Sequence, residues 1–371
     1  MSKPRPLWKP SYKITPLIAQ CLMDIEAARA VVDHTPLTPA EEADLRNQAR
    51  IRSTHYSTRI EGNRLTLSEA QQVIEGKKGK FHGRERDVRE VQNYWNALLK
   101  VEQWARQKKP LTEVLMQQLH GLVEKGARAK STPYRNGQNV IRDSTSGALV
   151  YMPPEAGDVP SLIVGMINWA ARAEKEKLPV PLLAGLLHYQ FVTIHPYYDG
   201  NGRTARLLAT FIFHRGGYGL NGFFSMEEHH ARDLEGYYRS LAVHPHHNYY
   251  EGRAEADLTP WLEYFIKTVA EVFSRAKEDV LHRTRKGGAP EPEALRRLDR
   301  RARIVLALFT RQVKITTGDV ARALGLSERM ARNLIGHWVE DGLLTLISTA
   351  KRNRAYGLSA IYRQFIGNDR H

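Results

Sequence analysis

The sequence predicts a mainly α-helical protein with one short β-hairpin and a small C-terminal domain of helices and strands. Most of the 371 residues lie in segments whose apolar residues recur at helical spacing. Helix-start signals precede several of these segments: Thr38-Pro39 stands before Glu41-Glu42, and Thr66 forms a capping-box pattern with Glu69. Runs that favour strands are confined to two regions, residues 134–154 and 343–358.

Caps, glycine stops and apolar spacing give the order of the elements. Helices are expected at residues 15–32, 39–60, 66–76, 88–107, 111–128, 161–175, 181–194, from the loop at 195–206 to Gly216-Gly217, 227–241, 258–275, 302–311, 317–324 and 327–341. Strands are expected around 134–142, 149–154, 343–348 and 355–358.

Charge and cysteine content indicate the expected partner of the chain and exclude two kinds of structural site. The net charge is +15, and residues 282–371 alone hold 18 Lys/Arg against 8 Asp/Glu, which favours a nucleic-acid partner for the C-terminal part. The single cysteine, Cys21, excludes an internal disulfide and a cysteine-based zinc site. With no apolar leader and no membrane-spanning run, we expect a cytoplasmic protein without a membrane partner.

One short segment, residues 195–206, combines the groups that phosphate chemistry needs. His195 offers a base near neutral pH, and Asp199 offers a hard oxygen ligand for Mg²⁺. Gly200 and Gly202 let backbone amides approach an anion at the start of the next helix. Arg203 and Arg206 lie on one helical face and suit a polyphosphate.

This segment resembles the signature HPFx(D/E)GNGRxxR of the Fic (Fido) family of nucleotidyltransferases, with Tyr197 in the phenylalanine position as its one departure. The resemblance implies a Fic-fold helical core that transfers AMP from Mg-ATP to a Ser, Thr or Tyr hydroxyl of a target protein or of itself. It implies His195 as the catalytic base and Asp199 as the metal ligand. The implied nucleotide-binding residues are Asp199, Gly200, Asn201, Gly202, Arg203, Thr204, Arg206 and Tyr238.

Upstream, Ser57, Glu61 and Gly62 resemble the inhibitory motif (S/T)xxxE(G/N) of Fic proteins that carry their own brake. The resemblance implies an ion pair between Glu61 and Arg206 that prevents the arginine from holding the γ-phosphate. In physical terms, a carboxylate competes with a phosphate for one guanidinium.

A predicted hairpin before the signature resembles the Fic flap, an edge that pairs with a target peptide through main-chain hydrogen bonds. Its expected target-binding residues are Asn139, Val140, Ile141 and Arg142. The expected domains are an N-terminal helical region with the inhibitory helix (1–108), the catalytic core (109–280), a linker (281–295) and a C-terminal domain (296–371).

The C-terminal domain resembles a winged helix-turn-helix, a module often found behind Fic domains. The candidate contacts to duplex DNA lie at the start of the second helix and in the wing: Ser327, Arg329, Arg332, Asn333, Lys351, Arg352 and Arg354. Such modules also serve as dimerisation or protein-docking units, so a homodimer stays open.

Three alternatives to AMP transfer remain at the level of the sequence. The same site could remove AMP from a modified protein, with Glu61 as the base for water. It could transfer another group, since nothing in the sequence fixes the nucleobase. In a different class, the chain could be a DNA-binding regulator whose Fic core senses a nucleotide.

Overall fold

The computed structural model describes residues 8–77, 81, 84–127, 130–142, 146–285, 293–296, 298–309, 312–348 and 354–363. The chain divides into two compact units, one with residues 1–34 and 48–277 and one with residues 35–47 and 278–371. The helices α2 and α11 contribute residues to both units.

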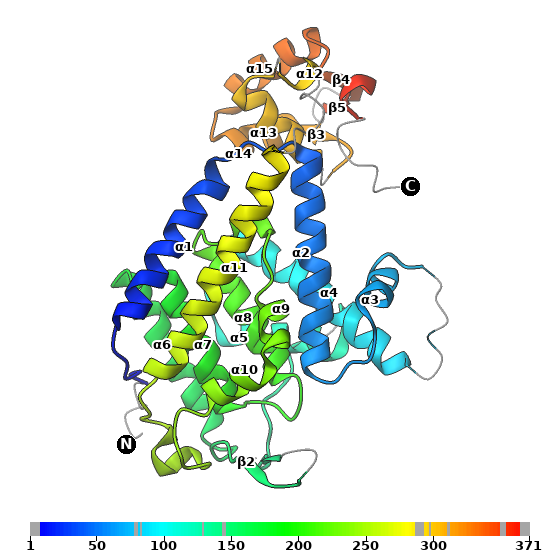
Figure 1. Ribbon diagram of the computed structural model, residues 1–371. Coiled ribbons are helices and arrows are strands. Elements are labelled where there is room, and N and C mark those ends of the chain that lie inside the picture. Colours follow the sequence, from blue (N-terminus) through cyan, green and yellow to red (C-terminus); the bar gives the residue numbers. More distant parts are fainter. Residues whose placement is uncertain are drawn as a thin grey trace, which may run out of the picture. The chain divides into compact units, whose positions relative to one another are not determined.

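The larger unit is helical apart from one hairpin (Figure 1). Its helices are α1 (Pro16–His34), α2 (Pro39–Ile60), α3 (Leu67–Ile74), α4 (Glu85–Arg106), α5 (Glu113–Lys125), α6 (Val159–Lys175), α7 (Val180–Ile194), α8 (Asn201–Arg215), α9 (Met226–Arg232), α10 (Leu234–Leu241) and α11 (Thr259–Arg285). Two short helical turns, η1 (Leu220–Gly222) and η2 (Tyr249–Arg253), and the hairpin of β1 (Ile141–Arg142) and β2 (Leu149–Tyr151) complete it. The fold class is the one that the sequence predicts.

The helices α7 and α8 form the centre of this unit and pack against each other, with α4 on the other side of α8. Nearly every residue of α7 is buried, which explains its apolar sequence. Gly185 lets α11 approach closely: the indole Nε1 of Trp261 donates to the Gly185 carbonyl at 2.8 Å, and a Cβ at Gly185 would lie 2.7 Å from Phe265. The loop between α7 and α8 therefore follows a closely packed, buried helix.

The helix starts follow the predicted caps. The Thr38 amide donates to Glu41 Oε2 at 2.9 Å and Thr38 Oγ1 accepts from the Glu41 amide, so α2 begins with a capping box. Thr66 and Glu69 make the same reciprocal pair at the start of α3. These two predictions are confirmed.

Most predicted helix ends lie within three residues of the observed ones, but two predicted helices differ more strongly. The helix expected at 227–241 is broken at Asp233, whose side chain leaves the helical pattern to accept from the Gly236 amide at 3.1 Å and so caps α10. The helix expected at 258–275 continues to Arg285, so residues 281–285, predicted as linker, are helical. Within the predicted linker, residues 286–292 lie outside the described part of the chain.

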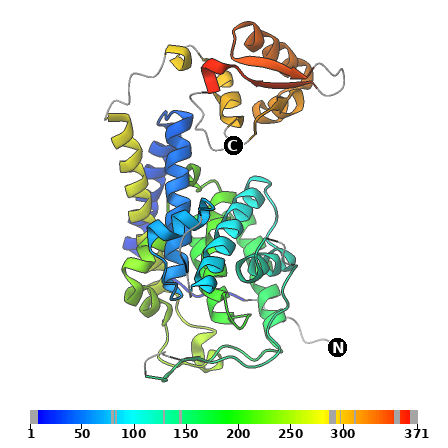
Figure 2. The ribbon, with the colours of Figure 1, turned by 90° about the vertical axis from the view of Figure 1, so that its right-hand side faces the viewer.

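The smaller unit has α12 (Glu293–Arg296), α13 (Arg300–Leu308), α14 (Thr317–Leu324), α15 (Glu328–Glu340), α16 (Ala360–Arg363) and an antiparallel sheet. The sheet consists of β3 (Ile315–Thr316), β4 (Leu344–Ser348) and β5 (Ala355–Leu358) in the order β3-β5-β4, and Figure 2 shows β4 and β5 side by side. The helix pair and the two long strands are where the sequence predicts them, and β3 is an additional strand. Assignment as a winged helix-turn-helix stays a prediction.

A second hydrophobic core belongs to this unit. Val305 and Leu306 of α13, Ile335 and Trp338 of α15 and Ile315 of β3 are among its buried residues. Among the described residues, no helix combines the length and the apolar character that crossing a membrane requires.

Candidate active site

The loop after α7 turns sharply because two residues adopt left-handed backbone conformations. His195 (φ 50°) ends α7, and Gly200 (φ 74°) stands directly before α8. A glycine accommodates this conformation without strain, whereas a histidine does so only where the surrounding structure holds it. The loop that joins α7 to α8 therefore has a left-handed residue at each of its ends.

The Asn201 side chain holds the loop together through two hydrogen bonds to the backbone of Tyr197. Its Oδ1 accepts from the Tyr197 amide at 3.0 Å, and its Nδ2 donates to the Tyr197 carbonyl at 2.8 Å. The side chain is buried, and both of its ends are used within the loop. We expected the Asn201 side chain to contact phosphate; the structure leaves only its backbone amide for that role.

His120 of α5 supports the loop from below, a role that the sequence did not suggest. Its ring stacks on Tyr197 with centroids 3.5 Å apart, and its Nε2 lies 2.9 Å from the Asp199 carbonyl oxygen. Because a carbonyl only accepts, this nitrogen carries the proton. Burial lowers the pKa of His120 to about 4, so the ring is neutral at physiological pH.

His195 is held in the tautomer that a general base requires. Its Nδ1 lies 3.3 Å from the Val192 carbonyl oxygen, so the proton of the neutral ring is on Nδ1 and the lone pair is on Nε2. Burial lowers the pKa of His195 to about 4, which keeps the ring neutral at physiological pH. Arg135, which is buried, donates from Nε to the His195 carbonyl at 2.9 Å and fixes the backbone there.

Arg206 is fully engaged by the end of α2. Its Nη2 donates to Glu61 Oε1 at 2.8 Å and to the Ser57 carbonyl at 2.9 Å, and its Nε donates to Ser57 Oγ at 2.8 Å. The Arg206 side chain is 2% exposed. Burial alone would lower the pKa of this guanidinium, but the Glu61 carboxylate, together with Tyr237 and Tyr94, raises it above the ordinary value. The pairing implied for Glu61 and Arg206 is present.

The Glu61 carboxylate also lies against the first turn of α8. A Cβ added at Gly202 would clash with Glu61 Oε1, so only a glycine permits this approach. A helix N-terminus attracts anions, and in this structure Glu61 is the anion beside it. Gly62 (φ 89°) ends α2 immediately afterwards and turns the chain away.

Arg203 is surrounded by carboxylates. Its Nη2 lies 3.1 Å from Glu124 Oε1 and 3.3 Å from Asp199 Oδ1, and its Nη1 lies 3.9 Å from Glu90 Oε1. Its side chain is 3% exposed. A Cβ at Gly200 would clash with Glu124, so this carboxylate packs against the loop as Glu61 does. The phosphate contact expected of Arg203 would require these pairs to rearrange.

Asp199 is the exposed acid of the loop, at 59% side-chain exposure. Its Oδ1 accepts from the Gly200 amide at 2.6 Å, and among the residues that the structure describes its Oδ2 forms an ion pair with Arg86 alone, at 3.8 Å. One accessible carboxylate beside a phosphate cradle fits Mg²⁺, which takes one or two protein carboxylates and completes its shell with phosphate oxygens and water. Within the described residues no cluster of three or more His, Cys, Asp or Glu side chains could hold a metal alone.

Two further residues predicted to bind the nucleotide differ in position. Tyr238 is 49% exposed and lies near Tyr237, with ring centroids 5.3 Å apart and the rings tilted by 46°. Partial burial raises the pKa of Tyr238, and the neighbouring Glu61 carboxylate adds to the shift, so this ring lies near Glu61. Thr204 is fully buried and its amide donates to the Gly200 carbonyl at 2.9 Å, so its side chain faces the core rather than a ligand.

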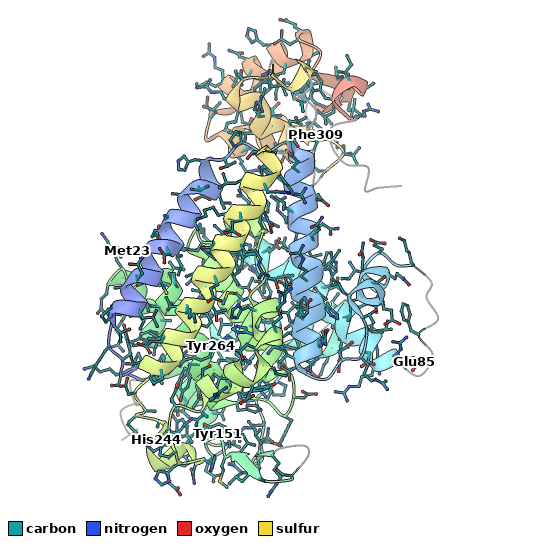
Figure 3. The ribbon with its side chains drawn as sticks, viewed as in Figure 1. Met23, Glu85, Tyr151, His244, Tyr264 and Phe309 are labelled. Carbon is teal, nitrogen blue, oxygen red and sulfur yellow. The ribbon has the colours of Figure 1, made fainter. Side chains whose placement is uncertain are left out.

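The hairpin lies beside this loop and has one occupied and one open edge. The Asn139 side-chain amide donates to the Tyr197 carbonyl at 3.4 Å, and Tyr151 Oη donates to the Thr193 carbonyl at 2.7 Å. These two hydrogen bonds fix the hairpin to the loop and to the end of α7. Beyond β2, Met152 pairs with the chain at His247 and Tyr249. Figure 3 shows Tyr151 and His244 at this same end of the unit.

The open edge of the hairpin belongs to β1. Ile141 and Arg142 pair only with β2 among the described strands, and Val140 beside them is 37% exposed. The strands are shorter than predicted, because residues 134–140 follow the catalytic loop instead of the sheet: the Arg135 amide donates to the Pro196 carbonyl at 2.9 Å.

Comparison with known proteins decides the family of this site. The Fic/DOC family profile matches residues 110–213, which include α5, the hairpin, α7 and α8. The chain contains a Fic/DOC domain. The resemblance inferred from the signature is thereby confirmed for this part of the chain.

Two curated relatives share the name protein adenylyltransferase Fic. Protein adenylyltransferase Fic of Drosophila grimshawi is 29% identical over 181 residues, which are 47% of this chain and 35% of that protein. The protein of the same name from Culex quinquefasciatus is 26% identical over 254 residues, 66% of this chain and 44% of that protein. The chain therefore spans less than half the length of these curated relatives.

Solved Fic structures share the fold. A Fic family protein from Desulfovibrio desulfuricans superposes with a TM-score of 0.60 at 26% identity, covering 95% of this chain and 99% of that one. A Fic domain containing signaling protein from Bacteroides thetaiotaomicron has a TM-score of 0.59 at 23% identity, covering 72% and 97%. The second likeness concerns the fold alone.

Outside the Fic domain, the DNA-contact candidates lie on the surface where the structure describes them. Ser327 caps α15, and Arg329, Arg332 and Asn333 are exposed on its first turns. Arg354 is exposed before β5, whereas Lys351 and Arg352 lie outside the described residues.

Proposed function

We propose that this protein transfers AMP from Mg-ATP to a Ser, Thr or Tyr hydroxyl of a target protein, and that Glu61 restrains the reaction. The Glu61–Arg206 pair is the observation that carries the proposal. A buried arginine beside a helix N-terminus is a site for an anion, and a carboxylate from α2 occupies it at 2.8 Å. A carboxylate oxygen there stands in for a phosphate oxygen. The Fic domain and the names of its relatives supply the reaction class.

The proposed chemistry uses His195 first. Its Nε2 lone pair takes the proton of the acceptor hydroxyl while the hydroxyl oxygen attacks the α-phosphorus and pyrophosphate leaves. The amides at the start of α8 stabilise negative charge that develops on the phosphate oxygens. Arg206 holds the γ-phosphate after Glu61 has withdrawn, which turns the α-phosphate toward the attacking hydroxyl.

Mg²⁺ would be held by Asp199 and the phosphates of the nucleotide. When bound, it neutralises charge on the α- and β-phosphates and so makes pyrophosphate a better leaving group. Arg86 is positioned to lose its 3.8 Å contact with Asp199 when the metal binds. Tyr238 offers an exposed ring for stacking on the adenine base.

The open edge of β1 suits the target. An extended peptide can add a third strand there through main-chain hydrogen bonds, with Asn139, Val140, Ile141 and Arg142 along the edge. Because β2 already pairs on its far side through Met152, addition at β1 is the arrangement that the hairpin leaves available. The same edge could receive a segment of a second copy of this chain.

The proposal is tested with ATP labelled on either the α- or the γ-phosphate. Glu61→Gly protein, incubated with a cell lysate, should incorporate α-label into protein and no γ-label, and mass spectrometry should find AMP on hydroxyl side chains. His195→Ala in the same background should abolish incorporation. Transfer of γ-label would indicate a kinase, and transfer that does not depend on His195 would overturn the assignment of this site.

The alternatives are arms of the same experiment. Incubation with an AMPylated target tests AMP removal, in which case the parent should release AMP and Glu61→Gly should not. Parallel reactions with UTP and GTP test the base, since the exposed Tyr238 ring stacks on any base.

We propose duplex DNA binding as a second function, carried by α15. Arg329, Arg332 and Asn333 lie three and four residues apart, so they share one exposed face, and neither arginine has an ion-pair partner in the described part of the chain. Arg329→Ala with Arg332→Ala should weaken duplex binding at least tenfold and lower the salt dependence. Arg239→Ala, an exposed arginine on α10, is the control. Equal binding by all three proteins would remove this function.

A further inference from the structure

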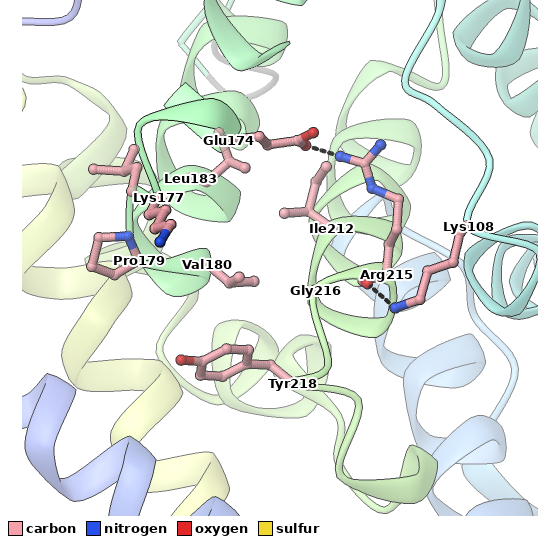
Figure 4. Close-up of a pocket in the computed structure, with 11 residues that line it drawn as sticks. Lys108, Glu174, Lys177, Pro179, Val180, Leu183, Ile212, Arg215, Gly216 and Tyr218 are labelled. Atoms are coloured by element: carbon pink, nitrogen blue, oxygen red, sulfur yellow. Dashed lines mark hydrogen bonds and ion pairs between the residues drawn. The ribbon is translucent and has the colours of Figure 1, made fainter. Parts of the chain in front are cut away.

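A pocket lies at the end of α8 opposite its catalytic end. It has a volume of about 540 Å³, and Arg215, the last residue of α8, is on its wall. In Figure 4, Lys177, Pro179 and Val180 lie on one side, Arg215 and Lys108 lie on the other, and Tyr218 closes a third side. All of these residues belong to the larger unit.

The pocket combines an apolar wall with an excess of positive charge. Leu183 and Ile212 are buried behind it, and Leu178, Pro179 and Val180 extend the apolar surface to the rim. Lys108, Lys177 and Arg215 face a single carboxylate, that of Glu174. Glu174 pairs with Arg215, whose Nη1 also donates to the Lys109 carbonyl at 3.3 Å. In the part of the chain that the structure describes, neither Lys108 nor Lys177 has a carboxylate within ion-pair distance.

Both lysines are held in a backbone conformation that favours glycine. Lys108 (φ 52°) and Lys177 (φ 60°) each follow a helix, α4 and α6, and the amide of the next residue closes the turn: Lys109 to Trp104 at 3.1 Å and Leu178 to Ala173 at 2.9 Å. Glycine is the residue usually found at such helix ends, because a side chain there is strained. Two lysines retained at this cost on one pocket indicate that their side chains are used.

The ammonium groups of Lys108 and Lys177 differ in their contacts. Lys108 Nζ donates to the Arg215 carbonyl at 2.6 Å, which places it at the C-terminal end of α8, whereas the Arg215 guanidinium extends toward Glu174 (Figure 4). A cation is favoured at a helix C-terminus, and this contact explains part of the presence of Lys108. Within the described part of the chain, the Lys177 side chain makes no corresponding hydrogen bond to a helix carbonyl, so its charge remains for a ligand.

We propose that this pocket binds a small amphipathic anion, with its acidic group between Lys177 on one wall and Lys108 and Arg215 on the other, and its apolar body against Leu178, Pro179 and Val180. The volume suits a molecule of drug or metabolite size. The acidic group is a carboxylate, sulfonate or phosphate, which lysine and arginine both bind. This site is separate from the Fic signature and does not depend on the function proposed for it.

The test uses the full chain and the fluorescent probe 1-anilinonaphthalene-8-sulfonate, an aromatic sulfonate. Titration of the parent should give saturable binding that octyl phosphate displaces and octanol does not. Lys108→Gly with Lys177→Gly should weaken probe binding at least tenfold. Because glycine fits both backbone positions, this double variant should unfold at the same or a higher temperature than the parent. Lys100→Ala, an exposed lysine on α4 outside the pocket, should bind as the parent does.

Three results would overturn the proposal. The first is probe affinity within twofold of the parent in the double glycine variant. The second is displacement of the probe by ATP with the same dependence on Glu61 as nucleotide binding, which would locate the probe in the catalytic loop. The third is sedimentation with phosphatidylglycerol vesicles combined with no displacement by octyl phosphate, which would make the lysines a membrane contact instead of a pocket for a soluble anion.

Discussion

Replacing the carboxylate of Glu61 is the perturbation that most directly changes the state of Arg206. In the parent, this buried guanidinium donates to Glu61 Oε1 at 2.8 Å. In Glu61→Gly, the guanidinium keeps its bonds to Ser57 Oγ and to the Ser57 carbonyl, at 2.8 and 2.9 Å, but has lost its negative partner. We therefore expect it to bind the γ-phosphate of ATP without a competitor.

The size of the effect follows from the geometry of the pair. A charge-assisted hydrogen bond contributes about 1.5–3 kcal/mol, and about 1.4 kcal/mol corresponds to tenfold. Loss of the competitor should raise ATP affinity, and the transfer rate at subsaturating ATP, by about 10- to 100-fold. Breaking a buried pair at one end also destabilises the fold, by up to about 3–5 kcal/mol where no other partner remains. The Ser57 contacts should reduce that cost.

Two measurements check this expectation. Isothermal titration should show the gain in ATP affinity. Thermal unfolding should show that Glu61→Gly melts below the parent and that added ATP stabilises it more than the parent, since a ligand at a hundred times its Kd adds about 2.7 kcal/mol. Glu61→Gln keeps the shape and an acceptor oxygen but removes the charge, so its ATP affinity should lie between those of the parent and Glu61→Gly. Equal ATP affinity in the parent and Glu61→Gly would refute the reasoning that Glu61 is a competitor for the phosphate site.

Three further predictions concern the loop itself. Burial holds the pKa of His195 at about 4, below its ordinary value, so the base stays unprotonated from pH 5.5 to 8. The kcat/KM for transfer by Glu61→Gly should therefore be constant over this range and fall as the pH drops toward 4. A midpoint near pH 6.5 would contradict this prediction. Gly202→Ala places a methyl group within clashing distance of the position of Glu61 Oε1, where we expect a phosphate oxygen. In the Glu61→Gly background it should lower ATP affinity at least tenfold by titration, whereas unchanged affinity would place the phosphates elsewhere. His120→Ala removes the partner of the Asp199 carbonyl, so thermal unfolding should show a loss of about 1–3 kcal/mol and more Mg²⁺ should be needed for transfer; an unaltered Mg²⁺ requirement would mean that His120 does not position Asp199.

The parts of the fold that local chemistry decides could be predicted from the sequence. The start of α2 depends on Thr38 and Glu41, three residues apart, and the end of α7 and start of α8 depend on residues within one short segment. The sequence does not predict the break at Asp233, because an aspartate inside a helical pattern can either stay in the helix or end it and cap the next one. In this chain it caps α10 by accepting from the Gly236 amide.

The contacts that join distant segments were visible only through the family resemblance or were not visible at all. Glu61 and Arg206 are 145 residues apart, and no local pattern links them. His120 and Arg135, which hold the loop from below and beside it, have no distinguishing neighbours in the sequence. Arg203 was expected to face phosphate because its spacing from Arg206 suits one, but carboxylates from α4 and α5 surround it in the folded chain.

The account depends on a separation of two roles in one loop: the amides and Arg206 hold the nucleotide, and His195 removes the proton. Comparing Glu61→Gly with Glu61→Gly/His195→Ala for both ATP affinity and transfer of α-labelled AMP measures that separation. We expect equal ATP affinity in the two proteins and no detectable transfer in the second. Transfer at the same rate in both, or loss of ATP binding together with His195, would contradict the account.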